Sequence, residues 1–91
     1  MSSLDRFVAS RNFVATLSVD SKSRNGKSVT VIDGLPKNAL FLDAMLKALK
    51  TKCGAGGTVE ASGKEGRLIV QGDQREKIRA YLASENITFK G

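Results

Sequence analysis

Basic side chains gather in two segments of the sequence. The segment SKSRNGK contains Lys22, Arg24 and Lys27, and the segment KALKTK contains Lys47, Lys50 and Lys52. The chain has 15 Lys and Arg against nine Asp and Glu, so these six cations equal its net charge of +6. Two all-basic segments on a small protein are typical of binding to a polyanion, most simply a nucleic acid. The alternative is that they keep the protein soluble and that lysines near a helix end interact with its dipole.

Residues able to catalyse covalent chemistry are scarce. The sequence has no histidine, so it lacks an imidazole for proton transfer near neutral pH. Its one cysteine, Cys53, allows neither an internal disulfide nor a multi-cysteine metal site, and we interpret it as a buried packing residue. We therefore expect a protein that is not an enzyme and that holds no metal or cofactor.

Two further motifs resemble phosphate-binding or acid–base sites but favour structural roles. The segment CGAGGT lacks the spacing of a phosphate loop and follows the predicted C-terminal end of a helix, where the dipole disfavours anions. We interpret it as a helix stop. Asp73, with Glu76 three residues later, predicts a helix start of the capping-box type. Arg75 and Arg79 lie one turn apart on a flank of that helix, where they are available to phosphates or to local ion pairs.

Alternating apolar residues predict a β-hairpin early in the chain. Between residues 13 and 19 the apolar side chains recur at every second position, which indicates a half-buried strand. The dipeptide Asn25-Gly26 is a turn signal. A returning strand over residues 29–32 is expected to end at Gly34 and Pro36. The predicted hairpin therefore has a basic tip.

Two helices and a second hairpin follow. A helix is expected from about Asn38, as its N-cap, to Lys52. Its apolar stripe at helical spacing consists of Leu42, Met45, Leu46, Leu49 and Cys53. Short strands are expected at residues 58–61 and 67–71, then a second helix after Asp73, and finally a closing strand that contains Ile87 and Phe89.

The order ββαββαβ predicts an α+β fold of two layers, in which a mixed five-stranded sheet is covered on one face by two helices. With 91 residues, the chain is expected to form a single domain over residues 12–91, preceded by a flexible arm at residues 1–11. No apolar run approaches the roughly 18 residues needed to span a membrane, so we expect no membrane partner. With a single cysteine, the cytoplasm is the expected compartment, and the protein is expected to be a monomer.

Three segments, in this order and spacing, resemble one known family. They are VTVIDG at Val29–Gly34, KCGAGGTV at Lys52–Val59 and IVQGDQR at Ile69–Arg75. This pattern is similar to the translation initiation factor family that contains the eukaryotic and archaeal start-codon-selection factor and its bacterial homologues. The resemblance covers about residues 25–82 and implies the same ββαββαβ fold.

The resemblance also implies a function. Members of that family bind the small ribosomal subunit near the decoding site, facing ribosomal RNA and the position of the initiator tRNA, together with other initiation factors. They control start-codon fidelity without covalent chemistry. The hairpin tip matches the ribosome-facing loop of the family, and the implied contact residues there are Lys22, Arg24, Asn25, Gly26 and Lys27. The first helix matches its second RNA-facing surface, with Lys47, Lys50 and Lys52.

Two alternatives remain open at this point. The first helix begins with Ala39, Leu40 and Phe41 where relatives usually carry charges, so Leu40 and Phe41 could form an apolar patch of a protein-interaction module or of a conditional translation regulator. A small acyl-phosphatase-like enzyme would suit the size and charge, but no anion cradle with a positioned Arg and Asn is evident in the sequence.

Overall fold

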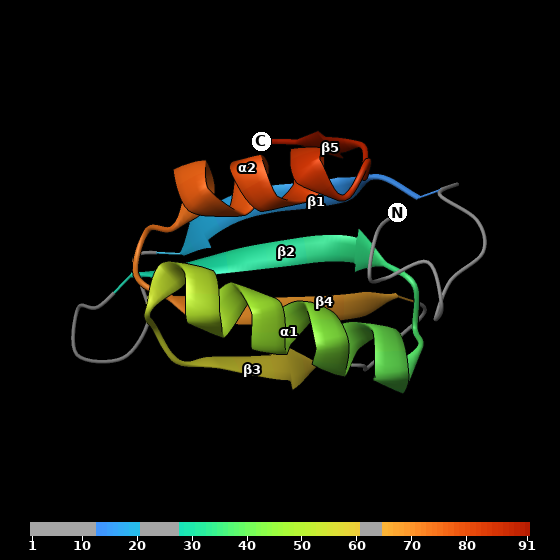
Figure 1. Cartoon of the computed structure of the whole chain (residues 1–91), viewed down its shortest axis with the longest axis horizontal. Helices are drawn as coiled ribbons and strands as arrows, with labels where there is room; N and C mark the ends of the chain where they lie inside the picture. Colours follow the sequence, from blue (N-terminus) through green and yellow to red (C-terminus); the bar gives the residue numbers. More distant parts are fainter. Residues whose placement is uncertain (1–12, 21–27, 61–64) are drawn as a thin grey trace.

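Five strands and two helices follow one another in the order ββαββαβ in the computed structural model, which describes residues 13–20, 28–60 and 65–91 (Figure 1). The elements are β1 (Ala15–Asp20), β2 (Val29–Leu35), α1 (Ala39–Cys53), β3 (Gly57–Glu60), β4 (Gly66–Gln71), α2 (Arg75–Ser84) and β5 (Phe89–Lys90). This order confirms the α+β fold predicted from the sequence. The expected arm at 1–11 and the expected tip residues Lys22, Arg24, Asn25, Gly26 and Lys27 lie outside the described residues.

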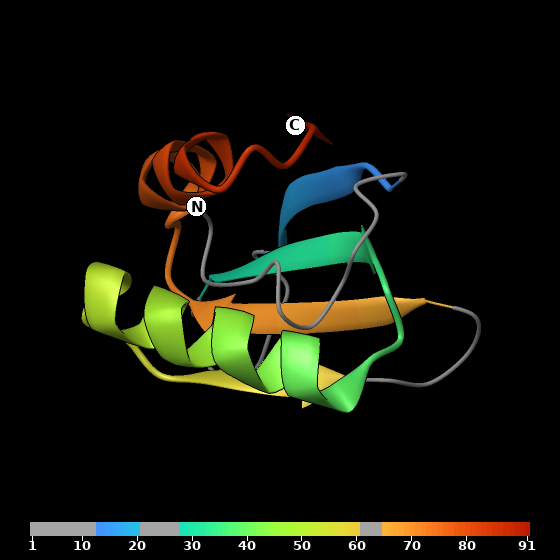
Figure 2. The same ribbon diagram turned by 45° about the vertical axis from the view of Figure 1, so that its right-hand side comes forward.

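The sheet is mixed, with the strand order β3-β4-β2-β1-β5. The pairs β1–β2, β2–β4 and β3–β4 are antiparallel, whereas β5 lies parallel to β1 with Phe89 beside Ala15. Both helices cover the same face, α1 over β3 and β4 and α2 over β1 (Figure 2). None of the helices in the described residues is long and apolar enough to cross a membrane.

The sequence of α1 explains where this helix begins and ends. The side-chain oxygen of Asn38 accepts hydrogen bonds from the backbone N–H groups of Leu40 and Phe41 at 3.0 and 3.1 Å, so the predicted N-cap is confirmed. At the other end Gly54 adopts the left-handed conformation, with φ of 63°, and its N–H donates to the carbonyl of Lys50. A residue with a β-carbon would be strained there, which is why the glycine-rich segment ends the helix.

The buried stripe of α1 differs from the predicted one by one exchange, because it includes Phe41 and leaves out Leu46. Its buried residues are Phe41, Leu42, Met45, Leu49 and Cys53. Leu46, which we expected in the stripe, is only half-buried and lies beside Gly57. A β-carbon at Gly57 would come within 2.7 Å of the backbone carbonyl oxygen of Ile69 in β4 and within 2.8 Å of the Leu46 side chain. The end of the leucine side chain can shift but the backbone carbonyl cannot, so this position of β3 requires glycine.

Strand β2 places alternate residues on the two faces of the sheet. Thr30 and Ile32 are fully buried beneath the helices, whereas Val29 and Val31, being one position removed, lie on the opposite face. The strand passes Gly34, the first of its two expected stops, and ends directly before Pro36, the second. The strand continues through Gly34 to Leu35 because a register irregularity after Ile32 accommodates the extra residues against β4.

Replacing a fully buried residue of α1 tests the packing of this stripe. Leu49→Ala should lower the free energy of unfolding by about 2–5 kcal/mol, because it leaves a cavity between α1 and the sheet. Leu40→Ala removes the same atoms from a side chain that is 66% exposed and should change stability little. Urea denaturation of both variants measures the difference, and equal effects would contradict the described orientation of α1.

Candidate nucleic-acid interface

Lys47 and Lys50 lie together on the outer face of α1. They are three residues apart, which places them on neighbouring turns of a helix, and both side chains are exposed. With Asp43, Leu46 and Thr51 they line a shallow groove of about 410 Å³. Among the described residues no salt bridge involves either lysine. Their ammonium groups are therefore presented to solvent from a helix whose opposite face is buried.

Lys52 is not part of this cation pair, although the sequence places it in the same segment. Two residues beyond Lys50, it is turned by about 200° around the helix axis. Its ammonium group lies 5.8 Å from the centre of the Tyr81 ring of α2, a cation–π distance. The three lysines predicted as one patch thus separate into a pair on the outer face of α1 and one residue beside α2.

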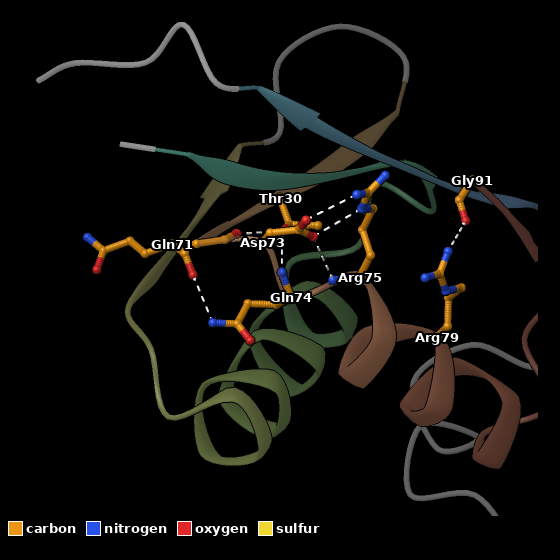
Figure 3. Close-up of polar contacts among 8 residues, drawn as sticks. Thr30, Gln71, Asp73, Gln74, Arg75, Arg79 and Gly91 are labelled. Atoms are coloured by element: carbon orange, nitrogen blue, oxygen red, sulfur yellow. Dashed lines mark hydrogen bonds and ion pairs between the residues drawn. The ribbon is translucent and has the colours of Figure 1, made fainter. Parts of the chain in front are cut away.

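The turn between β4 and α2 is held against β2 by one buried hydroxyl group. The Thr30 hydroxyl donates to the carbonyl of Gly72 at 2.6 Å and accepts from the backbone N–H of Gln74 at 2.8 Å (Figure 3). The N–H of Gly72 in turn donates to the carbonyl of Ser28 at 2.8 Å. Sequence reasoning missed Thr30; the available signal was a hydroxyl residue at an inward-facing position of a strand.

Arg75 uses its guanidinium group locally. Its Nε and Nη2 atoms donate to the two carboxylate oxygens of Asp73, each at 3.0 Å (Figure 3). These hydrogen bonds lower the pKa of Asp73 and raise that of Arg75. The predicted capping box was wrong: α2 begins at Arg75, its N-cap is Gln74, and no side chain caps it. The carboxylate of Asp73 binds mainly the guanidinium group, because among the described residues its one bond to the backbone is long, 3.4 Å from the Arg75 nitrogen.

Arg79 also makes a local contact and lies apart from the lysine pair. Its Nη1 atom donates to the Gly91 oxygen at 2.8 Å, beyond the end of β5 (Figure 3). In Figure 1, β5 and α1 lie on opposite sides of α2. The structure thus shows the predicted local ion pair for Arg75 and a backbone hydrogen bond for Arg79, and contact of either residue with a phosphate stays a prediction.

The predicted apolar patch of Leu40 and Phe41 is wrong in one of its two residues. Leu40 is 66% exposed, but Phe41 is fully buried and packs edge-to-face against Phe13, with ring centres 5.7 Å apart. Adjacent residues of a helix point about 100° apart, so only one of them faces solvent. A single exposed leucine is common on protein surfaces and indicates no interface by itself.

Cys53 occupies the buried end of the α1 stripe, as expected. Burial raises the pKa of its thiol, while the charge of Lys77 opposes this shift in part. A raised pKa leaves less of the nucleophilic thiolate at neutral pH. The position of Cys53 thus suits packing better than reactivity.

Comparison with known proteins identifies the family. Residues 14–88 match the family described as translation initiation factor SUI1. Over 67 residues the chain is 51% identical to the uncharacterized protein sll0546 of Synechocystis sp., covering 74% of this chain and 57% of that protein. Over 59 residues it is 44% identical to the protein translation factor SUI1 homolog of Methanopyrus kandleri, covering 65% and 52% respectively. The chain thus spans little more than half the length of these relatives.

A solved structure shows the same fold. The crystal structure of the C-terminal domain of human eIF2D superposes with a TM-score of 0.70 at 21% sequence identity, covering 86% of this chain and 42% of that chain. At this identity the likeness concerns the fold alone.

Removing the Thr30 hydroxyl tests its role in holding the β4–α2 turn. Thr30→Val leaves the Gly72 carbonyl and the Gln74 N–H without their buried partner and should cost about 1–3 kcal/mol of unfolding free energy. Thr30→Ser retains the hydroxyl and should cost less, about 0.8 kcal/mol for the lost methyl. Chemical denaturation ranks the two variants; a serine variant weaker than the valine variant would refute the role of the hydroxyl.

The Asp73–Arg75 pair predicts a pH dependence. The pKa of Asp73 lies below its ordinary value of 3.8 in the folded protein, so the pair stabilises the fold above the unfolded-state pKa. This contribution is lost as the pH falls through the lowered folded-state pKa. Carbon-detected NMR titration of the Asp73 carboxylate measures the shift directly. Arg75→Gln should return the pKa towards 3.8, and an unchanged titration in that variant would mean that another group causes the shift.

Proposed function

Since the chain belongs to the translation initiation factor SUI1 family, we propose that it acts in translation initiation by binding ribosomal RNA of the small subunit near the decoding site. There it would control the fidelity of start-codon and initiator-tRNA selection without catalysing a reaction. The initiator tRNA and other initiation factors are its proposed neighbours, and the cytoplasm is its proposed location.

The observation that supports this proposal most directly is the exposed cation pair Lys47 and Lys50. Phosphate contacts by Lys and Arg supply most of the affinity for RNA and fix the orientation of the bound protein. A helix held by five buried residues presents the two charges in one defined direction. The flexible side chains then lose entropy, but the helix itself requires no ordering upon binding.

The proposed second contact is the segment between β1 and β2. Its expected RNA-binding residues lie outside the described residues, but the strands on either side are paired up to Asp20 and Val29. This end of the sheet also holds the C-terminal end of α1 (Figure 1). Asp20 and Val29, which flank the segment, therefore lie at the same end of the sheet as the C-terminal end of α1.

Charge reversal of the lysine pair tests the proposed RNA contact. The double variant Lys47→Glu, Lys50→Glu should fold normally, since both side chains are exposed, and should bind the isolated small ribosomal subunit at least ten-fold more weakly. The charge-matched control Lys77→Glu, Lys90→Glu changes exposed lysines outside the groove and should weaken binding much less. Co-sedimentation with small and large subunits measures both. Equal loss in the two double variants would indicate diffuse attraction without a defined site.

A salt series distinguishes phosphate contact from apolar contact. Three to six phosphate contacts predict a slope of about −2 to −5 for the logarithm of the binding constant against that of the salt concentration. Replacing Lys47 or Lys50 by Ser should make the slope less negative by about one unit. A slope near zero would contradict the RNA proposal.

A further inference from the structure

The outer edge of β3 presents main-chain groups that pair with no other strand of the described residues. In the described part of the chain, β3 is the last strand of the sheet and pairs with β4 alone. The N–H of Gln71 donates to the carbonyl of Gly56, and in an antiparallel pair the bonded positions alternate. Thr58 and Glu60 are therefore directed at β4, opposite Ile69 and Arg67. The N–H and C=O groups of Gly57 and Val59 point the other way.

The two edges of the sheet are built differently. The edge at β5 is only two residues long and includes Lys90, and short charged edges resist the addition of another strand. The edge at β3 is four residues long, GTVE, with no proline, lysine or register shift. Its one charged residue, Glu60, lies 3.5 Å from Arg67 in an ion pair on the face away from the helices. In the described part of the chain, β3 thus lacks the proline, the lysine and the bulge that commonly protect an edge strand.

The flank of α1 beside this edge supplies positive charge. Leu46 packs against Gly57, so the groove that Leu46 lines together with Lys47 and Lys50 borders the start of β3. Asp43 contributes one negative charge to the groove against these two positive ones. Side chains of an added strand opposite Gly57 and Val59 would project towards α1, because Val59 itself packs against the core on that side. Carboxylates at those positions would lie on the same side of the sheet as the groove that the two lysines line.

We propose that the edge of β3 and the flank of α1 form a docking site for an extended acidic peptide of a partner protein, which adds to the sheet as a further strand. Main-chain hydrogen bonds to Gly57 and Val59 provide affinity, and alternate acidic side chains facing Lys47 and Lys50 provide selectivity. A second copy of this chain is a poorer occupant, because pairing two β3 edges brings the lysine pairs of two proteins with net charge +6 together.

Hydrogen exchange on the unaltered protein tests the proposal. The probe is a capped nine-residue peptide in which valine and glutamate alternate, and the matched control peptide has lysine in place of glutamate. Saturation with the glutamate peptide should slow amide exchange at Gly57 and Val59 at least ten-fold, and leave Thr58 and Glu60, already paired with β4, little changed. The lysine peptide should produce no protection. Unchanged exchange at Gly57 and Val59 would refute the proposal.

A proline substitution provides the mutational test. Val59→Pro removes the outward N–H without removing a bond to β4, and proline is tolerated at such edge positions. The control Val59→Ala loses similar side-chain packing but keeps the N–H. Affinity for the glutamate peptide, measured by fluorescence anisotropy, should fall at least ten-fold in Val59→Pro relative to Val59→Ala. Equal affinities would exclude strand addition at β3.

Two further outcomes concern the partner and the RNA site. Self-association of the free chain that Val59→Pro abolishes would identify a second copy as the occupant and overturn the peptide proposal. The inference does not depend on the proposed RNA contact, because Val59→Pro leaves Lys47 and Lys50 in place. This variant should lose the peptide and retain the small ribosomal subunit, so failure of one proposal is recognised separately from failure of the other.

Discussion

The burial of one apolar stripe of α1 against the sheet is the constraint on which the rest of this structure depends. Phe41, Leu42, Met45, Leu49 and Cys53 are removed from water together, and this fixes the rotation of the helix about its own axis. As a consequence, Lys47 and Lys50 face solvent and the side chain of Leu46 lies next to Gly57. The direction of the cation pair is thus a product of hydrophobic packing rather than of electrostatics.

A second, polar constraint acts where β4 leads into α2. The buried hydroxyl of Thr30 forms hydrogen bonds with a carbonyl and an N–H of the β4–α2 turn. These bonds fix the position of the turn relative to β2. The same turn brings Asp73 alongside Arg75. A guanidinium that is already paired with a carboxylate offers less to a phosphate, because that pair must first be broken. The number of basic residues in the sequence is therefore larger than the number of cationic groups available to a phosphate.

The two proposed interactions share the outer flank of α1. An RNA phosphate and a peptide carboxylate would compete for Lys47 and Lys50, whereas the edge groups of β3 can bind only the peptide. The groove is shallow and its net charge is small, so neither ligand has to displace a buried group. An acidic partner strand on β3 would accordingly weaken the proposed RNA contact, which links the two sites by simple exclusion.

The sequence by itself determined the order and type of all seven elements, because hydrophobic periodicity, the Asn38 cap and the Gly54 stop are local signals. It also determined that Lys47 and Lys50 lie on the face of the helix opposite the buried stripe.

Tertiary contacts decided the side-chain positions that residue spacing along one helix cannot predict. Phe41 is buried and packs against Phe13, and the ammonium group of Lys52 lies over the Tyr81 ring of another helix. Asp73 pairs with Arg75 instead of capping α2, in a turn whose position is fixed by the Thr30 hydroxyl. The outer edge of β3 is open because, among the described strands, β3 is the last in the sheet. Each of these outcomes is a contact between segments or a choice among nearby partners, and such contacts are settled by packing in three dimensions.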